Sequence, residues 1–300
     1  MCALAHPIDV RRTLSPIQRG PADPAFQRRG DEIWRASRMP TGPVTVRLLP
    51  LAPDRVEAVA WGPGAAEHLE TLPRLLGAER SLDGLRPDHP VVADALRRFP
   101  GVRLAETRRP MEALIPAVLE QKVLGVDAFA SWRRLLHRHG EPAPGPAPER
   151  MRLPLEAEAW AALPSWEWHR AGVDPARYRT AQRAARHGAS LERLVARGTE
   201  PTPVYRALRS IPGIGVWTAA EVGSRALGDL DAVPFGDYHL GNLVGVGLVG
   251  ERLTDDTDIA AALEPFRPYR GLVVRWLQLS PLVRVERRGP RMSRIDYRRI

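Results

Sequence analysis

The residues of this sequence with the clearest chemical potential are a glycine-rich turn and one aspartate that follows it. The run Ile211–Ala220 reads IPGIGVWTAA, and Asp237 follows that turn by about six helical turns. Gly213 and Gly215 allow a backbone turn with positive φ and leave its amides uncovered by side chains. Such amides, beside a helix that opens at Val216, form a seat for a phosphate group. The spacing therefore predicts a phosphate-binding hairpin with a carboxylate aimed at what the hairpin holds.

Asp237 has two interpretations. A fixed carboxylate near C1′ of a nucleotide stabilises the positive charge that develops on the sugar when an N-glycosidic bond breaks. Asp237 also precedes a predicted helix over Tyr238–Leu243, so its alternative role is an N-cap, and the two roles are compatible. His239 is the nearest candidate for a general acid, with helix packing as its alternative. Asp229 and Asp231 are interpreted as solvated loop carboxylates.

The hairpin also has a plainer alternative, because Pro-Gly turns join many helix pairs without binding a ligand. Its flanks favour two short apolar helices that cross closely. The apolar residues are Leu208 and Ile211 before the turn and Val216, Ala219 and Ala220 after it.

The remaining sequence predicts an α+β segment followed by helices. Strands are expected at Glu32–Ser37, Val44–Leu49 and Arg55–Trp61, because these short β-branched or aromatic stretches are separated by Pro/Gly turns. One helix is expected over Gly64–Gly77. Further helices are expected, by spacing of apolar residues, at Met111–His139 (interrupted near Gly125), Ala157–Ala162, Pro175–His187, Ser190–Arg197, Val204–Ser210, Val216–Leu227, Asp258–Leu263 and Tyr269–Leu279. Gly140–Pro148 is a proline-rich loop, and Ser165–Val173 is expected to be a Trp-rich connection containing the structural residues Trp166 and Trp168.

Composition favours an anionic partner without proving one. The formal net charge is +9, and all basic residues except Lys122 are arginine. Arginine binds phosphate through a planar fork and stacks on bases, although an arginine-rich composition without a nucleic-acid role remains the alternative. The last residues, RVERRGPRMSRIDYRRI, form a basic tail and a candidate phosphate clamp.

The cysteine count and the hydropathy of the sequence exclude several classes of protein. Cys2 is the single cysteine, so neither a disulfide framework nor a four-cysteine iron–sulfur cluster can form. No apolar run approaches the ~20 residues that cross a bilayer, and no signal-peptide pattern opens the sequence. We expect a cytoplasmic protein, associated with the nucleoid if bacterial.

The run from Tyr205 to Asn242 resembles the catalytic segment of the helix-hairpin-helix DNA glycosylases, in which a Pro-Gly-Ile-Gly hairpin precedes a catalytic aspartate. Met111–Ser131, containing AVLEQKV, resembles the helix that these enzymes place beside the lesion. The likeness extends to about Leu279 and is nearest to the AlkA-like (3-methyladenine type II) branch.

The resemblance implies a role for each matching residue. Asp237 would be catalytic, and Pro212, Gly213, Ile214 and Gly215 would bind the DNA backbone. A monovalent cation, Na+ or K+, would sit on hairpin carbonyls near Ile211 and Gly213, and no organic cofactor is implied. Gln121 and Lys122 stand where the family inserts a residue into the base stack, with a solvated helix face as the alternative.

Three residues are candidates for a base pocket. Trp217 matches a tryptophan of the alkylpurine branch and stands where some relatives carry a Schiff-base lysine, so strand cleavage by that route is not expected. Glu221 replaces an aromatic of the AlkA type, which leaves base selection open. Trp276 could line the pocket or belong to the core, and the same choice applies to Trp217.

The resemblance implies a mainly α fold of two helical subdomains with an N-terminal α+β domain. The expected divisions are 1–100 for the α+β domain, 101–283 for the helical domain with its hairpin unit at 204–227, and 284–300 for the basic tail. The implied protein is a monomeric, monofunctional glycosylase of alkylated purines in duplex DNA. A site without a clear general acid suits bases that are already cationic, such as N3- or N7-alkylated purines. The alternatives are a glycosylase of oxidised or deaminated bases and a non-catalytic DNA-binding protein.

Overall fold

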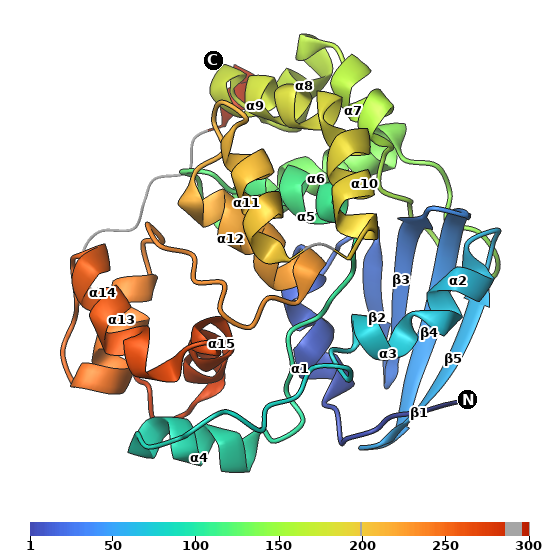
Figure 1. The fold of residues 1–300 in the computed structure, drawn as a ribbon. Helices are drawn as coiled ribbons and strands as arrows, with labels where there is room; N and C mark the ends of the chain where they lie inside the picture. Colours follow the sequence, from blue (N-terminus) through green and yellow to red (C-terminus); the bar gives the residue numbers. More distant parts are fainter. Residues whose placement is uncertain (199, 286–295, 300) are drawn as a thin grey trace.

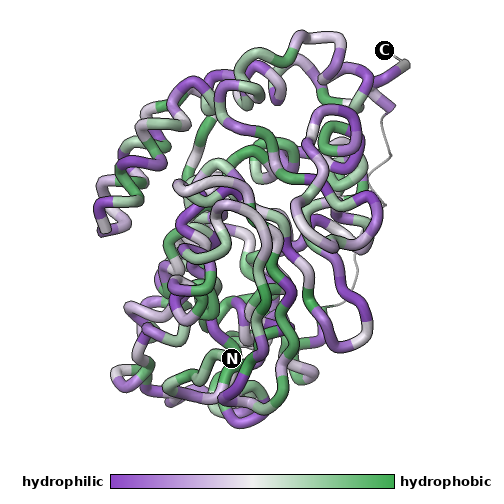
Figure 2. The backbone as a smooth tube through the Cα atoms, turned by 90° about the vertical axis from the view of Figure 1, so that its right-hand side faces the viewer, coloured by the Kyte–Doolittle hydropathy of each residue, from purple (hydrophilic) through white to green (hydrophobic). Residues whose placement is uncertain are grey.

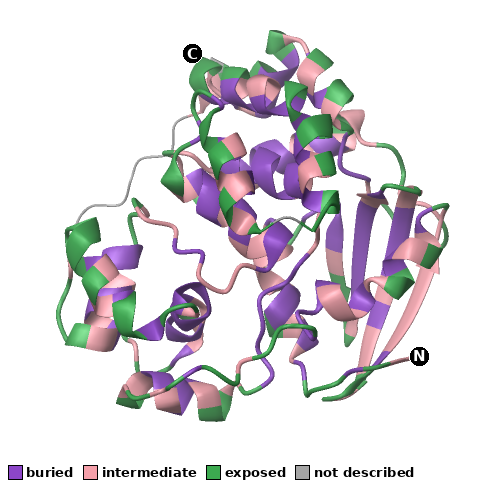
Figure 3. Ribbon diagram, in the orientation of Figure 1, coloured by how far each residue is buried: buried purple, intermediate pink, exposed green. Residues whose placement is uncertain are grey.

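A computed structural model describes residues 1–198, 200–285 and 296–299 of the chain. Three packed parts are visible in Figure 1: an N-terminal sheet, a central group of helices above it in the view, and a second group of helices at the lower left. Each part has its own buried core, and Figure 3 shows those cores as buried stretches inside the sheet and both helical groups. No helix among the described residues is both long and apolar enough to traverse a lipid bilayer.

The described N-terminal part is an antiparallel sheet in the order β1-β5-β4-β3-β2. The strands are β1 Cys2–Ala3, β2 Phe26–Arg29, β3 Glu32–Met39, β4 Gly42–Ala52 and β5 Arg55–Trp61. The three expected strands are confirmed: β3 and β4 are longer than predicted, and β5 has the predicted bounds. β1, β2 and the short helix α1 Val10–Leu14 were not predicted. The expected helix over Gly64–Gly77 is two helices, α2 Ala65–Glu70 and α3 Leu72–Leu75. Pro73 lies in the first turn of α3, where its missing N–H leaves no hydrogen bond unmade.

Eight helices among the described residues form the central group, which packs on one apolar core. They are α5 Pro110–Leu119, α6 Gly125–His139, α7 Ala157–Ala162, α8 Ser165–Ala171, α9 Pro175–Arg186, α10 Gly188–Ala196, α11 Pro201–Arg209 and α12 Val216–Val222, and a π-helical segment over Gly223–Leu227 continues α12. The expected Trp-rich connection is wrong, because α8 occupies it and ends at Gly172 in the left-handed conformation. The fully buried Trp168 ring packs 5.5 Å from that of Trp160.

The second helical group is built from two distant pieces of the sequence. α4 Pro90–Arg98 packs against α15 Arg270–Leu279, and α13 Leu240–Val244 and α14 Asp256–Leu263 complete the group. A π-helical segment over Gly245–Val249 follows α13. The expected domain boundary at residue 100 therefore does not follow the packing, since α4 belongs to this core and not to the sheet. Figure 2, which views the chain from the right-hand side of Figure 1, shows hydrophobic and hydrophilic stretches alternating along the backbone.

The basic tail is only partly described. Residues 286–295 and 300 lie outside the described residues, so the predicted phosphate clamp cannot be located there. A short 3-10 turn, Tyr297–Arg299, packs near α8, and the guanidinium of Arg177 lies 5.3 Å from the Tyr297 ring centre.

Candidate active site

The hairpin between α11 and α12 is held from within by two isoleucines. Ile211 and Ile214 are buried, and the Ile214 amide donates to the Ile211 carbonyl at 3.0 Å. Pro212, Gly213 and Gly215 are exposed. The buried pair thus fixes the turn while the proline and the glycines face outward.

The two hairpin glycines differ in conformation. Gly213 has φ +97°, where a side chain is strained, and a Cβ added there would also clash with Thr180. Gly215 has φ −97° and ψ −172°, which is ordinary extended backbone. The expectation of positive φ is therefore confirmed at Gly213 and wrong at Gly215. A Cβ at Gly215 would meet no described atom within 4 Å, so the fold itself does not require a glycine there.

The loop after α5 is tied to the hairpin by Gln121. Its side-chain amide donates to the Gly213 carbonyl at 3.0 Å and to the Thr218 hydroxyl at 2.9 Å. α5 ends at Leu119, so neither Gln121 nor Lys122 lies on a solvated helix face. Gln121 is thereby engaged with its own chain in this structure, whereas Lys122 is exposed with φ +54°.

The hairpin carbonyls proposed for a cation already have donors. The Ile211 carbonyl accepts from the Ile214 amide, and the Gly213 carbonyl accepts from Gln121. The Gln121 amide thus supplies at Gly213 the positive partner that a cation would provide. A Na+ or K+ ion there stays a prediction.

Asp237 lies where the chain passes from the central helices into the second helical group. One carboxylate oxygen accepts from the indole N–H of Trp217 at 3.0 Å, and the other accepts from the backbone N–H of His239 at 2.7 Å. α13 begins only at Leu240, and its N-cap position is His239. Asp237 therefore closes a side-chain turn over the two following residues, and the exact N-cap assignment is wrong.

Trp217 links the two helical groups. It lies in the first turn of α12 and is half-buried, while its bond reaches Asp237 on the other group. Core packing and pocket lining were the alternatives for this ring, and the hydrogen bond adds a third role, which is to hold the carboxylate.

Glu221 follows Trp217 by one helical turn and is paired. Its carboxylate lies 2.6 Å from Arg225, and burial raises the pKa of the Glu221 carboxyl, with Arg225 opposing that rise. Arg19, from the loop after α1, makes a similar buried pair with Glu120 at 2.8 Å. Sequence reasoning missed Arg19, because nothing local to residue 19 signals a contact with residue 120.

Two further aromatic residues, Trp276 and Tyr238, differ in solvent exposure. Trp276 is fully buried in the second helical core, which favours the core alternative for its ring. Its place in a base pocket stays a prediction. Tyr238, which sequence reasoning left out, is 75% exposed and lies edge-on to His239, 5.1 Å away. Its position directly after Asp237 was the available signal.

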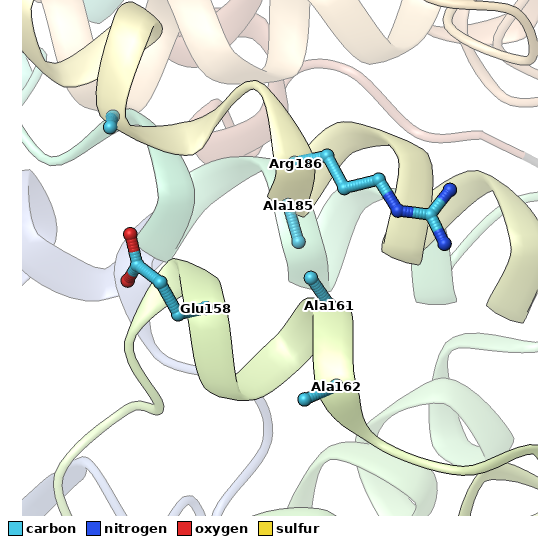
Figure 4. Close-up of a pocket in the computed structure, with 6 residues that line it drawn as sticks. Glu158, Ala161, Ala162, Ala185 and Arg186 are labelled. Atoms are coloured by element: carbon cyan, nitrogen blue, oxygen red, sulfur yellow. The ribbon is translucent and has the colours of Figure 1, made fainter.

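The hollow in Figure 4 does not belong to this site. Glu158, Ala161 and Ala162 line it from α7, and Ala185 and Arg186 line it from α9. None of these residues contacts Asp237 or the hairpin through any described hydrogen bond, and the lining is mostly alanine. Chemistry is therefore assigned to Asp237 and not to this hollow.

Comparison with known proteins identifies the fold. No family model matches the chain. A 3-methyladenine DNA-glycosylase from Archaeoglobus fulgidus superimposes with a TM-score of 0.77, at 16% identity over 92% of this chain and 96% of that one. An 8-oxoguanine glycosylase/lyase from Clostridium acetobutylicum gives 0.70, at 11% identity over 92% and 93%. The chain therefore shares its overall fold with these DNA glycosylases.

A curated protein is similar to this chain in sequence. The chain is 27% identical over 216 residues to a probable bifunctional transcriptional activator/DNA repair enzyme AlkA of Mycobacterium tuberculosis, which covers 69% of this chain and 42% of the relative. The chain thus spans less than half the length of the curated relative that it matches. The chain is thus similar in sequence to an AlkA relative and similar in fold to a 3-methyladenine DNA-glycosylase.

Proposed function

We propose that this chain is a monofunctional DNA glycosylase that hydrolyses the N-glycosidic bond of alkylated purines, of the 3-methyladenine and 7-methylguanine type, in duplex DNA. The observation that carries the proposal is the Asp237 carboxylate, held by Trp217 at the joint between the two helical groups. The AlkA-like similarity supports the substrate class.

The chemistry follows from where charge moves. When the bond between C1′ and the base nitrogen breaks, its electron pair leaves with the base and positive charge develops on the sugar. The Asp237 carboxylate stabilises that charge, and because Trp217 and His239 already orient it, little reorganisation is needed. Water then adds to C1′ and loses a proton. The products are the free base and an abasic site.

The leaving base explains why a general acid is dispensable. A purine alkylated at N3 or N7 carries a positive charge, so the departing electron pair makes it neutral. An undamaged purine would leave as an anion unless an acid protonated it. His239 is exposed, and its described contact is the Tyr238 ring, which gives it no defined acid role.

The DNA backbone would be anchored by the hairpin. Pro212, Gly213 and Gly215 are exposed, and α12 has no described side-chain cap on its first amides. Such amides suit a phosphate, and a base flipped from the duplex would reach Asp237. We therefore propose that the protein binds duplex DNA as a monomer.

Absence of strand cleavage is part of the proposal. Schiff-base chemistry needs a nucleophilic amine at the sugar, and the hairpin position that carries a lysine in some relatives is Trp217. An enzyme acting on 8-oxoguanine is the second candidate, supported by the fold shared with the Clostridium acetobutylicum enzyme.

An excision assay on matched duplexes tests the proposal. Each duplex would contain 7-methylguanine, hypoxanthine, 8-oxoguanine or uracil, and released base would be quantified against time. We expect excision of 7-methylguanine above all others. Preferred release of 8-oxoguanine would favour the second candidate, and release of none, with DNA bound, would indicate a non-catalytic DNA-binding protein.

A further inference from the structure

Two arginines and two glutamates form a buried charge cluster beside the candidate active site. The Arg19–Glu120 pair spans 2.8 Å, and the Arg225–Glu221 pair spans 2.6 Å. The four side chains are 4–17% exposed. Two positive and two negative charges leave the cluster neutral when both glutamates are ionised, which is the state that a buried cluster favours.

The cluster is assembled from three distant parts of the chain. Arg19 comes from the N-terminal loop, Glu120 follows the end of α5, and Glu221 and Arg225 lie on α12 and its π-helical continuation. Arg225 also donates to the Pro16 carbonyl at 2.8 Å, which fastens the same N-terminal loop. π-helical segments occur frequently at functional sites.

Glu221 is the glutamate of this cluster that lies on the same helix as Trp217. Trp217, Glu221 and Arg225 are spaced four residues apart, so their side chains lie along one helix face. At one end of that face, the Trp217 indole holds Asp237. The charge of Asp237 adds to burial and to Glu120 in raising the pKa of Glu221, as expected for neighbouring carboxylates.

The Glu221 side chain is also slightly exposed to solvent, at 13%, whereas that of Trp276 is not. A base bound beside Asp237 and Trp217 would therefore have this carboxylate one helical turn away. The Arg225 guanidinium lies behind that carboxylate and stabilises its charge.

We infer that Glu221 is a specificity-determining residue that favours cationic purines over neutral lesions. The inference rests on the proposed glycosylase function and concerns the same site. A carboxylate attracts a base that carries a positive charge. For a neutral base, negative charge builds up on the departing ring, and the same carboxylate opposes it. Discrimination between two substrates follows from such differences in their transition states.

The test compares two substrates in two variants. Single-turnover excision is measured at and above neutral pH on duplexes with 7-methylguanine, which is cationic, and hypoxanthine, which leaves as an anion unless protonated. Glu221→Gln keeps the shape and removes the charge. The ratio of the two rates should fall by roughly 10- to 100-fold, the order expected for one charge–charge interaction near a protein surface. Glu221→Asp keeps the charge and should retain most of the ratio.

Glu120→Gln is the matched control. It removes one carboxylate from the same cluster but lies off the Trp217 face, so the ratio should stay near the wild-type value. If Glu221→Gln fails to fold by circular dichroism, the test uses the double variant Glu221→Gln and Arg225→Gln in its place. The double variant removes both members of the ion pair and leaves no unpaired charge.

The possible failures are distinguishable. If the wild type excises neither base, the proposed function is wrong. If the wild type excises 7-methylguanine and the folded glutamine variant keeps its rate ratio within about twofold, only the role of Glu221 is wrong. An equal fall in the ratio with Glu120→Gln would likewise overturn it, because the effect would then belong to the cluster's charge balance.

Discussion

Both carboxylate oxygens of Asp237 accept a hydrogen bond from the same chain, and each oxygen has a different donor. Trp217 approaches from α12, and the His239 backbone amide approaches from the turn that Asp237 itself closes. A carboxylate fixed in this way cannot rotate freely toward solvent. At the residue scale, this arrangement suits electrostatic stabilisation of a positive charge. Position 217 carries an indole and so supplies no amine for covalent attack on a sugar.

The absence of that amine predicts the product. Borohydride should trap no covalent enzyme–DNA adduct during excision, and strands should break only after alkali or heat. Lys122 is the one lysine in the sequence, so Lys122→Ala removes every lysine and is a stringent control. Trapping by the wild type that persists in Lys122→Ala would contradict the prediction and identify the N-terminal amine as the nucleophile.

At the element scale, the two glycines of the hairpin are under different constraints: the fold requires one of them, and a ligand would require the other. Gly213 satisfies the fold, because its φ of +97° and the nearby Thr180 exclude a side chain. Gly215 has no such constraint in the described protein, yet it is exposed at the start of α12. Its small size is explained if the backbone of another molecule approaches it closely.

Gly215→Val should consequently weaken DNA binding without unfolding the protein. Affinity for damaged and undamaged duplexes should fall by a similar factor, since phosphate contacts position a protein without reading the base. The thermal midpoint should stay within a few degrees of the wild type. Fluorescence anisotropy at several salt concentrations measures the affinities. For both proteins, affinity for undamaged DNA should fall by about 0.9 log units per log unit of salt for each phosphate neutralised.

Gly213→Val is the contrasting variant. It should lower the thermal midpoint as well as DNA affinity, because positive φ strains a β-branched residue. Full DNA affinity in a folded Gly215→Val protein would mean that the hairpin is only a structural turn and that the backbone anchor lies elsewhere.

At the scale of the whole molecule, the helix α2, which packs on the sheet, carries a buried group that links stability to pH. His68 on α2 is 2% exposed, and neither ring nitrogen has a hydrogen-bond partner among the described residues. Burial, with a smaller contribution from the nearby Arg35, lowers the pKa of His68 to about 3. The folded protein therefore holds this imidazole neutral where the unfolded chain would protonate it.

The sign of the effect follows from proton binding. Between pH 6.5 and about 3 the unfolded chain binds a proton at His68 that the folded chain does not, so acid favours unfolding. This group should lower the free energy of unfolding by about 1.4 kcal/mol for each pH unit below ~6.5, or about 2 kcal/mol at pH ~5. His68→Leu should remove that loss. Urea unfolding at two pH values measures it, with the exposed His169→Gln as control, and an unchanged loss in His68→Leu would refute it.

Local signals explain why much of this architecture could be predicted. The hairpin, α7, and the starts of α9 and α12 follow from prolines, glycines and caps close to each boundary. The packing of α4 on α15 and the reach of Arg19 to Glu120 join residues far apart in sequence, and no periodicity reports such contacts. The burial of Trp276 and the extended backbone of Gly215 likewise depend on tertiary surroundings. Local patterns thus predicted helix boundaries better than they predicted which side chains are exposed.

Asp237→Asn tests the central claim most directly. Excision of 7-methylguanine should fall by ~10²–10³-fold or more, because one preorganised charge at the reacting centre is lost, while binding to abasic DNA should remain near normal. Asp258→Asn, which removes an exposed carboxylate from α14, should excise at the wild-type rate. Single-turnover release of the base, measured with folding checked by circular dichroism, decides the matter. Near-wild-type excision by folded Asp237→Asn would contradict the account and remove this carboxylate from the mechanism.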